Sequence, residues 1–157
     1  MAVEAPLSKF KKNGFKIYIT VLAALAIWFA YDGYLNKDFI KKHTLDHDTE
    51  NTRPDVTLVF NQKAPLFLLA GAAALAVYFF MTKDRKLTAD DTALTINGKK
   101  VIAYDKIERI DKTHFDAKGY FVITYVAGGG KETDLKLSDR VYDNLSAVLD
   151  ELVAKIS

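Results

Sequence analysis

Two long apolar runs, separated by a polar connector, constrain this chain more than any other feature of its sequence. The first covers residues 17–31, between Lys16 and Asp32, and the second covers residues 64–81 and contains no charged side chain. A helix needs about 20 predominantly apolar residues to cross a bilayer core. The 75 residues after position 82 are too few to build a core that surrounds two such helices. The sequence therefore predicts a membrane hairpin.

Flanking residues bring the first run to spanning length. Aromatic rings and a lysine stem extend the first run, because such side chains favour the lipid–water interface. Pro65 falls where the second helix is expected to begin, a position that tolerates proline. The expected organisation is an N-terminal tail at residues 1–14, a first span at 15–34, a connector at 35–63, a second span at 64–82 and a soluble domain at 83–157.

The first run also has the basic head of a signal peptide. Lysines precede it, as they do in a cleaved secretory signal. However, Phe29 and Tyr31 place bulky rings where a cleavage site needs small residues. We therefore expect a retained anchor.

The distribution of basic residues predicts the orientation of the hairpin. The first 16 residues hold four lysines and one acid, and three basic residues follow the second run within four positions. The connector from residue 32 to 63 holds five basic and six acidic residues. Cytoplasmic segments carry the excess of Lys and Arg. We expect both termini in the cytoplasm and the connector on the other side of the membrane.

The connector holds the one cluster of candidate metal ligands, at His43, Asp46, His47, Asp48 and Glu50. The two histidines are four residues apart, but no glutamate follows the first as a zincin motif requires. A calcium loop is also excluded, since its glycine and its bidentate glutamate are missing. A solvated loop is expected here, after a short interfacial helix at residues 36–43 and before a β-prone segment at 55–60. Whether the connector is a docking surface or a flexible loop stays open.

The second half of the chain has the pattern of an antiparallel sheet followed by one helix. Short alternating segments are separated by turn-forming residues such as Asn97 and Gly98, a strong hairpin signal. The expected strands cover residues 93–96, 100–104, 107–110, 120–126 and 132–137. After Ser138, apolar residues at helical spacing run from Val141 to Ile156 on one face. Such a helix must lay its apolar face on the sheet, so the domain class is α+β.

This arrangement resembles the bacterial PH-like domain. The resemblance rests on residues 87–98, on residues 102–107 with Ile110 and Asp111, on Lys118 with Gly119, and on residues 135–138 before the helix. It implies a bent sheet or split barrel that is closed by its C-terminal amphipathic helix, in a family of unknown role. Eukaryotic relatives bind inositol phosphates through basic residues near the first hairpin. Here Lys99 and Lys100 flank that turn, but the next four residues add no positive charge.

No residue set in the sequence predicts catalysis, a cofactor or a metal centre. The chain has no cysteine, which excludes thiolate chemistry. Residues 83–157 carry 13 basic and 13 acidic side chains, so no field attracts nucleic acid. Residues 128–131 lack the spacing of a phosphate loop and predict a hairpin turn. His114 stands in a predicted turn, where a surface role is expected.

The apolar runs contain small residues four apart, which let helices approach closely in lipid. The candidate helix-packing residues are Ala26, Ala30, Ala70, Gly71 and Ala74. They predict packing of the two spans on each other, packing against another membrane protein, or both. Two helices alone do not enclose a transport path, so a self-sufficient carrier is not expected without homo-oligomerisation.

These observations predict a non-catalytic membrane protein. We expect an accessory or stabilising subunit of a larger, for example bioenergetic, membrane complex, whose partners are the bilayer and other membrane subunits. The alternative is a membrane-tethered sensor or a lipid- or peptide-binding module, with strand addition near Tyr104, Lys106 and Lys131 as one mode.

Overall fold

The computed structural model describes residues 2–45 and 52–156, and it divides into two compact units. One unit, here called the sheet domain, consists of residues 1–13 and 81–157. The other, the helical hairpin, consists of residues 14–80. The hairpin is thus inserted into the sequence of the sheet domain, which contains both ends of the chain.

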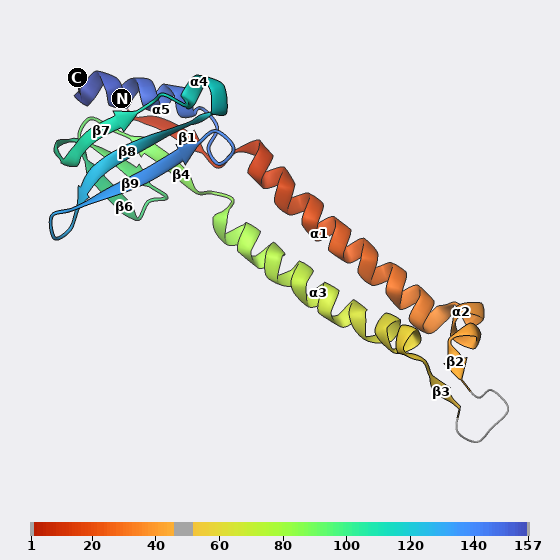
Figure 1. Ribbon diagram of the computed structural model, residues 1–157. Helices are drawn as coiled ribbons and strands as arrows, with labels where there is room; N and C mark the ends of the chain where they lie inside the picture. Colours follow the sequence, from red (N-terminus) through yellow and green to blue (C-terminus); the bar gives the residue numbers. More distant parts are fainter. Residues whose placement is uncertain (1, 46–51, 157) are drawn as a thin grey trace. The chain divides into compact units, whose positions relative to one another are not determined.

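Two long helices form the hairpin. Helix α1 (Lys9–Ala30) continues into a π-helical turn, η1 (Tyr31–Leu35), and the short helix α2 (Lys37–Lys42) follows. A two-residue ladder joins β2 (Thr44–Leu45) to β3 (Arg53–Pro54), and α3 (Val56–Thr82) returns. Figure 1 shows α1 and α3 side by side and antiparallel. The short helix expected at residues 36–43 is confirmed as α2, with Asn36 as its N-cap.

Helix α3 begins eight residues earlier than the sequence suggested. The expectation of a strand over residues 55–60 is wrong, because these residues form the first turns of α3. Asp55 starts the helix: its carboxylate accepts from the Leu58 amide at 2.8 Å, and its carbonyl accepts from the Val59 amide at 3.0 Å. A good N-cap contributes more than the small helix penalty of β-branched residues removes.

The sheet domain contains two antiparallel sheets. The first has the order β1-β4-β5-β6, formed by Val3–Pro6, Lys86–Ala89, Ala93–Ile96 and Lys100–Ala103. The second has the order β7-β8-β9, formed by Ile107–Asp111, Tyr120–Ala127 and Lys131–Ser138. The short helices η2 (Tyr104–Lys106) and α4 (Phe115–Lys118) precede and follow β7. The turn expected at Asn97 and Gly98 is present, with positive φ at both residues.

The first strand of the domain comes from before the hairpin, in the segment that the sequence assigned to a tail. Strand β1 pairs with β4 in the register Val3↔Ala89 to Pro6↔Lys86. Ala5 of β1 is fully buried, and the Leu7 amide donates to the Arg85 carbonyl at 2.8 Å. The domain therefore does not begin at residue 83: its sheet needs residues on both sides of the hairpin.

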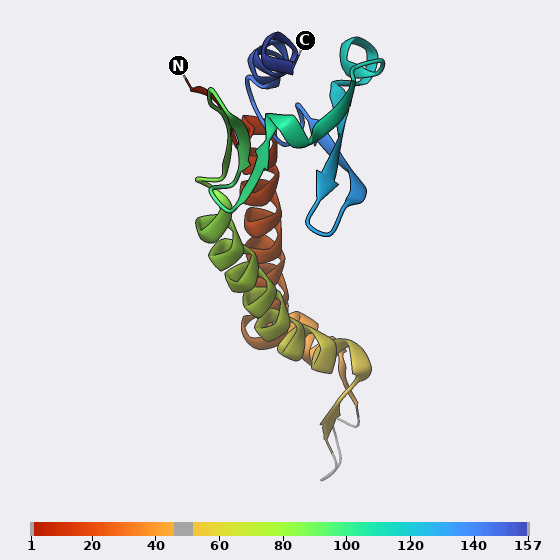
Figure 2. The same ribbon diagram turned by 90° about the vertical axis from the view of Figure 1, so that its left-hand side faces the viewer.

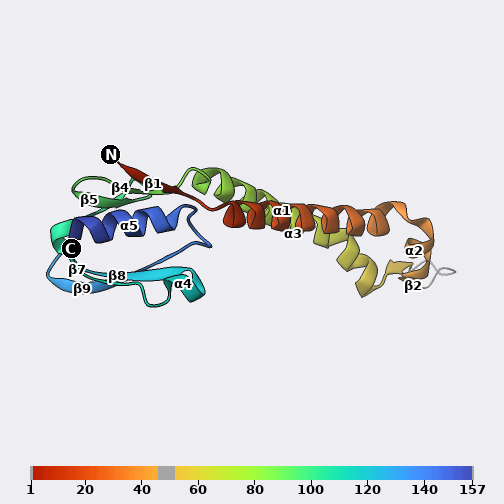
Figure 3. The ribbon, with the colours of Figure 1, turned by 90° about the horizontal axis from the view of Figure 1, so that it is seen from above.

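Helix α5 (Leu145–Ile156) packs between the two sheets, as Figures 2 and 3 show. Its buried face consists of Leu145, Val148, Leu149 and Leu152. These side chains join one hydrophobic core with the inward residues of both sheets, among them Leu87, Leu94, Phe121 and Ile123. The coarse prediction of two long apolar helices, a separate antiparallel sheet region and a C-terminal helix is confirmed.

Candidate functional site

The surface of the helical hairpin is the first candidate site. The helices Lys9–Leu35 and Val56–Thr82 are each 27 residues long and apolar enough to cross a membrane. Only 6% and 17% of their most apolar windows are buried. The more exposed side chains include Ile17, Ile27, Trp28, Leu66, Phe67 and Val77. Soluble proteins rarely expose apolar patches of this extent.

Aromatic contacts hold α1 and α3 together at both ends of the hairpin. At one end the Phe15 ring lies 5.6 Å from the ring of Tyr78 and 6.0 Å from that of Phe79, measured between centroids. At the other end Phe29 meets Phe60 edge to face at 5.5 Å. Tilted and edge-on geometries are the favourable ones for ring pairs.

Gly33 lies against the backbone of Asn61 on the facing helix. A Cβ atom added to Gly33 would lie 2.8 Å from the Asn61 carbonyl oxygen, so only glycine fits. Pro65 lies four residues after Asn61 inside α3 and has no N–H to donate to that carbonyl. The proline thus removes the usual helical partner of the carbonyl that Gly33 faces.

Side chains next to this contact bridge the two helices. The Tyr34 hydroxyl donates to the Gln62 carbonyl at 2.8 Å, and the Gln62 side-chain amide donates to the Gly33 carbonyl at 3.1 Å. On the first helix and its π-helical turn, Asp32 accepts from the Trp28 indole at 2.9 Å and from the side-chain amide of Asn36 at 2.8 Å. The sequence reasoning missed Gly33, Asn61 and Gln62. The signal for this contact in the sequence was the polar pair Asn61–Gln62, since Asn61 lies four residues before Pro65.

The five small residues singled out from the sequence fall into two groups. Ala26 is buried, Ala30 and Gly71 are half-buried, and the Gly71 Cα faces the Leu22 side chain across the hairpin. Ala70 and Ala74 are exposed. The first group lies in the contact between α1 and α3, whereas the second lies on the open face of α3.

The connector carries one histidine–carboxylate pair. His43 Nδ1 lies 2.8 Å from Asp55 Oδ2, and the Asp55 amide donates to the His43 carbonyl at 2.8 Å. Hydrogen bonds from the Leu58 amide and from His43 lower the pKa of Asp55. This pair therefore joins the end of α2 to the start of α3. The other members of the expected ligand cluster, at residues 46–50, lie outside the described residues.

Within residues 2–45 and 52–156, no three His, Cys, Asp or Glu side chains lie together as a metal site. His114 is exposed, with its ring 5.3 Å from that of Tyr120. Gly128 to Gly130 form the turn between β8 and β9, as expected. Lys100 points at Tyr125, with its Nζ 4.6 Å from the ring centroid. Local structure accounts for the positions of His114, Gly128 to Gly130 and Lys100.

A partly buried tyrosine marks the contact of η2 with α5 and the loop between β4 and β5. The Tyr104 hydroxyl donates to the Asp90 carbonyl at 2.7 Å. Burial, followed by the charges of Asp90, Glu151 and Asp91, raises the pKa of Tyr104 to about 12. Lys155 of α5 bonds Asp91 at 3.0 Å, which raises the pKa of Lys155 and lowers that of Asp91. The loop is thereby fixed to the C-terminal helix.

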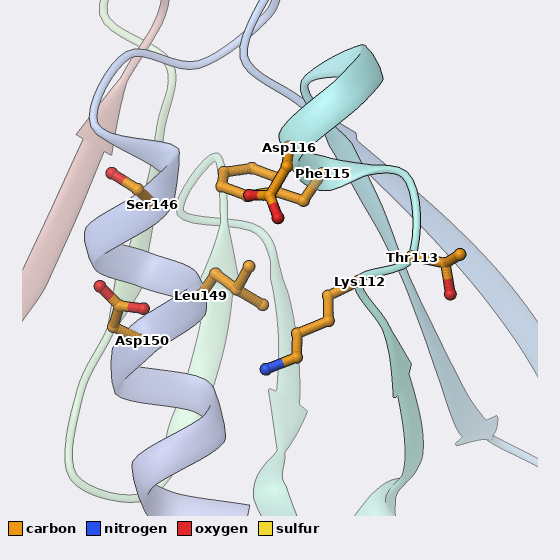
Figure 4. Close-up of a pocket in the computed structure, with 7 residues that line it drawn as sticks. All are labelled: Lys112, Thr113, Phe115, Asp116, Ser146, Leu149 and Asp150. Carbon is orange, nitrogen blue, oxygen red and sulfur yellow. The ribbon is translucent and has the colours of Figure 1, made fainter.

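The sheet domain also has a surface cavity of about 630 Å³ beside α4 and α5. Figure 4 shows the residues that line it: Lys112, Thr113, Phe115, Asp116, Ser146, Leu149 and Asp150. Phe115 and Leu149 supply apolar walls, and Lys112, Asp116 and Asp150 supply charges. This mixture suits a peptide or another ligand with both apolar and charged groups.

Comparison of the chain with protein-family models, with curated proteins and with solved structures finds no match. The arguments for a function therefore come from the geometry of the hairpin and of the sheet domain.

Proposed function

We propose that this chain is a non-catalytic integral membrane protein that acts as an accessory or stabilising subunit of a larger membrane complex. The observation that carries the proposal is the hairpin surface, where only 6% and 17% of the most apolar windows of two 27-residue helices are buried. Burial of apolar surface is the main favourable term in folding. A lipid bilayer would bury the exposed apolar side chains of the hairpin without any further protein core.

Two other kinds of helix share this length and composition, and the structure argues against both. The core helix of a soluble protein is mostly buried, whereas these two are mostly exposed. A signal peptide is removed after its apolar run. Cleavage after α1 would also remove β1, which pairs with β4 and places Ala5 in the core.

The strand pairing also supports a common side of the bilayer for both termini. The hairpin leaves the sheet domain after β1 and returns just before β4, and these two strands are neighbours. The hydrogen bond from the Leu7 amide to the Arg85 carbonyl joins the two points. Basic residues follow each of them: Lys9, Lys11, Lys12 and Lys16 on one side, and Lys83, Arg85 and Lys86 around the other. Positive charge of this kind favours the cytoplasmic side of a bacterial inner membrane.

The architecture of the sheet domain supports the PH-like resemblance. Four strands and three strands form two antiparallel sheets, and a C-terminal amphipathic helix fills the space between them. We infer that this domain serves as an adaptor on the cytoplasmic face. Such a role needs a folded binding surface and no catalytic residues.

Lateral contacts in the bilayer would use the open face of α3. Ala70 and Ala74 are exposed there, and small residues allow another helix to approach closely. Replacing both with leucine should release the partner. The same replacement at Ala24, an exposed alanine on α1, is the matched control and should leave the partner bound.

The test is extraction from native membranes in a mild detergent, followed by native mass measurement. The proposal expects the chain to resist a carbonate wash and to co-purify with other membrane subunits in a fixed ratio. A complex of identical copies alone, or a solitary chain, would contradict the subunit role and favour the membrane-tethered binding module. Recovery in the carbonate supernatant would contradict membrane insertion altogether.

A further inference from the structure

Two cavities adjoin along one side of the sheet domain. The larger, of about 630 Å³, is lined by α4, α5 and the segment that follows β7 (Figure 4). The smaller, of about 240 Å³, is lined by β7 itself and by the C-terminal half of α5. Lys112 lines both. Together they form one groove beside β7 and α5, which we call the β7–α5 groove.

One wall of this groove is an unpaired strand edge. Strand β7 pairs with β8 on one side, and no other described strand pairs with its second side. The ladder is irregular between Ile107 and Arg109 and regular from Arg109 to Asp111. The outward backbone groups of an edge strand are available to another extended chain. The regular stretch therefore offers main-chain hydrogen bonds along the groove.

The opposite wall, formed by α5, carries several apolar side chains. Val153 and Ile156 of α5 line the groove next to Ile110, and all three are partly buried. Farther along, Leu149 and Phe115 face the larger cavity (Figure 4). In an added strand, alternate side chains point to one face. These apolar residues can receive those side chains, which is how strand-adding domains obtain specificity.

The charges of the larger cavity indicate which side chains fit. Asp116 and Asp150 line it and form no ion pair with any described residue. Lys112 is the one basic residue in its lining. The carboxylates thus outnumber the cation, so a basic side chain is the complementary partner.

We propose that the β7–α5 groove binds an extended segment of a partner protein, which adds to β7 as a further strand. An apolar side chain of this segment packs against Leu149 and Phe115, and a lysine or arginine faces Asp116 and Asp150. The inference rests on the proposed function, because it names the surface by which the adaptor domain holds another subunit. It differs from edge addition near Tyr104, Lys106 and Lys131 in its place and in its apolar wall.

The test uses the full-length chain in nanodiscs of zwitterionic lipid, panned with a displayed library of random decapeptides. The expected result is enrichment of peptides that alternate apolar residues and carry Lys or Arg. Amide shifts on titration with the best synthetic decapeptide should fall on β7 and α5. Absence of enrichment, or shifts confined to other elements, would overturn the proposal.

Backbone methylation of that decapeptide tests strand addition directly. Only every second amide of an added antiparallel strand points at its neighbour. N-methylation of one alternate set should weaken binding at least tenfold, and methylation of the other set should leave it within about twofold. Equal effects of the two sets would rule out pairing with β7.

The charge requirement has its own variants. Asp116→Asn with Asp150→Asn should weaken a lysine-containing decapeptide about tenfold and leave its lysine-to-norleucine analogue unchanged. Asp105→Asn, an exposed carboxylate outside the groove, is the matched control and should change neither. If the chain co-purifies with membrane subunits but selects no groove-binding peptide, the groove proposal fails and the subunit role stands. If peptides bind the groove but the chain purifies without other membrane subunits, the groove proposal stands and the subunit role fails.

Discussion

Replacing Ala5 with aspartate should destabilise the sheet domain severely, although this residue precedes the hairpin and lies 82 residues before its strand partner Leu87. Ala5 is fully buried in the core. The Ala5→Asp variant must either bury a carboxylate, which costs several kcal/mol, or release β1 from the sheet.

The structure gives the size of the second effect. Release of β1 exposes Leu7, which is 6% exposed in the folded domain. It also breaks the hydrogen bonds of the Leu7 amide with Arg85 and of the Asp143 amide with the Pro6 carbonyl. Together with the other β1 contacts these are worth about 5 kcal/mol. That is a large share of the roughly 5–15 kcal/mol that stabilises a typical domain.

The assay is a urea titration of the full chain in a mild non-ionic detergent, followed by tyrosine fluorescence and by hydrogen exchange of the β4 amides. The variant should lose most of its unfolding free energy, and the amides of Lys86–Ala89 should exchange rapidly. Glu4→Ala is the matched control, since Glu4 is the exposed neighbour in β1 that pairs with Lys86. A surface pair of this kind is worth below about 1 kcal/mol. Equal urea midpoints for Ala5→Asp and the native chain would refute the placement of β1 in the core.

Three further results are expected from the hairpin and the sheet domain. Gly33→Ala should lower the unfolding free energy of the hairpin by about 1–3 kcal/mol, because its Cβ would lie 2.8 Å from the facing backbone. Gly71→Ala, with its nearest contact at 3.9 Å, should be neutral in the same thermal unfolding assay in detergent. Asp55 has a pKa below its usual 3.8, so its stabilising cap is present above pH 3.8 and is lost as the pH falls below that value. Hydrogen exchange at Leu58 should accelerate in that acid range, and unchanged exchange would contradict the cap. Ultraviolet titration should show Tyr104 ionising near pH 12, and Tyr104→Phe should remove that step and no other.

The local patterns of the sequence were enough to predict most elements of this structure. The two apolar runs appear as the two long helices, because a helix satisfies its backbone hydrogen bonds within one segment of chain. The alternating segments after residue 86 appear as strands. The apolar stripe expected from Val141 to Ile156 appears as the helix α5, which begins four residues later, at Leu145. Each of these elements depends on residues that are close together in the sequence.

Long-range contacts determined the rest. Nothing in the short segment Val3–Pro6 distinguishes a strand from a tail until β4 lies beside it. The residues directly after Asp55 prefer strands. They are helical because Asp55 caps their first turn and because they continue into the rest of α3. Position 33 requires glycine only because the Asn61 backbone lies opposite it. The groove beside β7 likewise needs α5, which the chain brings there from more than 30 residues away.

Sequence alone thus determined that this protein has a hairpin of two long apolar helices and a small antiparallel domain, because periodicity and apolar length are properties of adjacent residues. Tertiary structure alone decided that β1 completes the domain across the inserted hairpin. It also decided that β7 ends its sheet among the described strands and lies beside α5. Strand partners and grooves depend on residues that are distant in the chain, and their meeting is a property of the folded core.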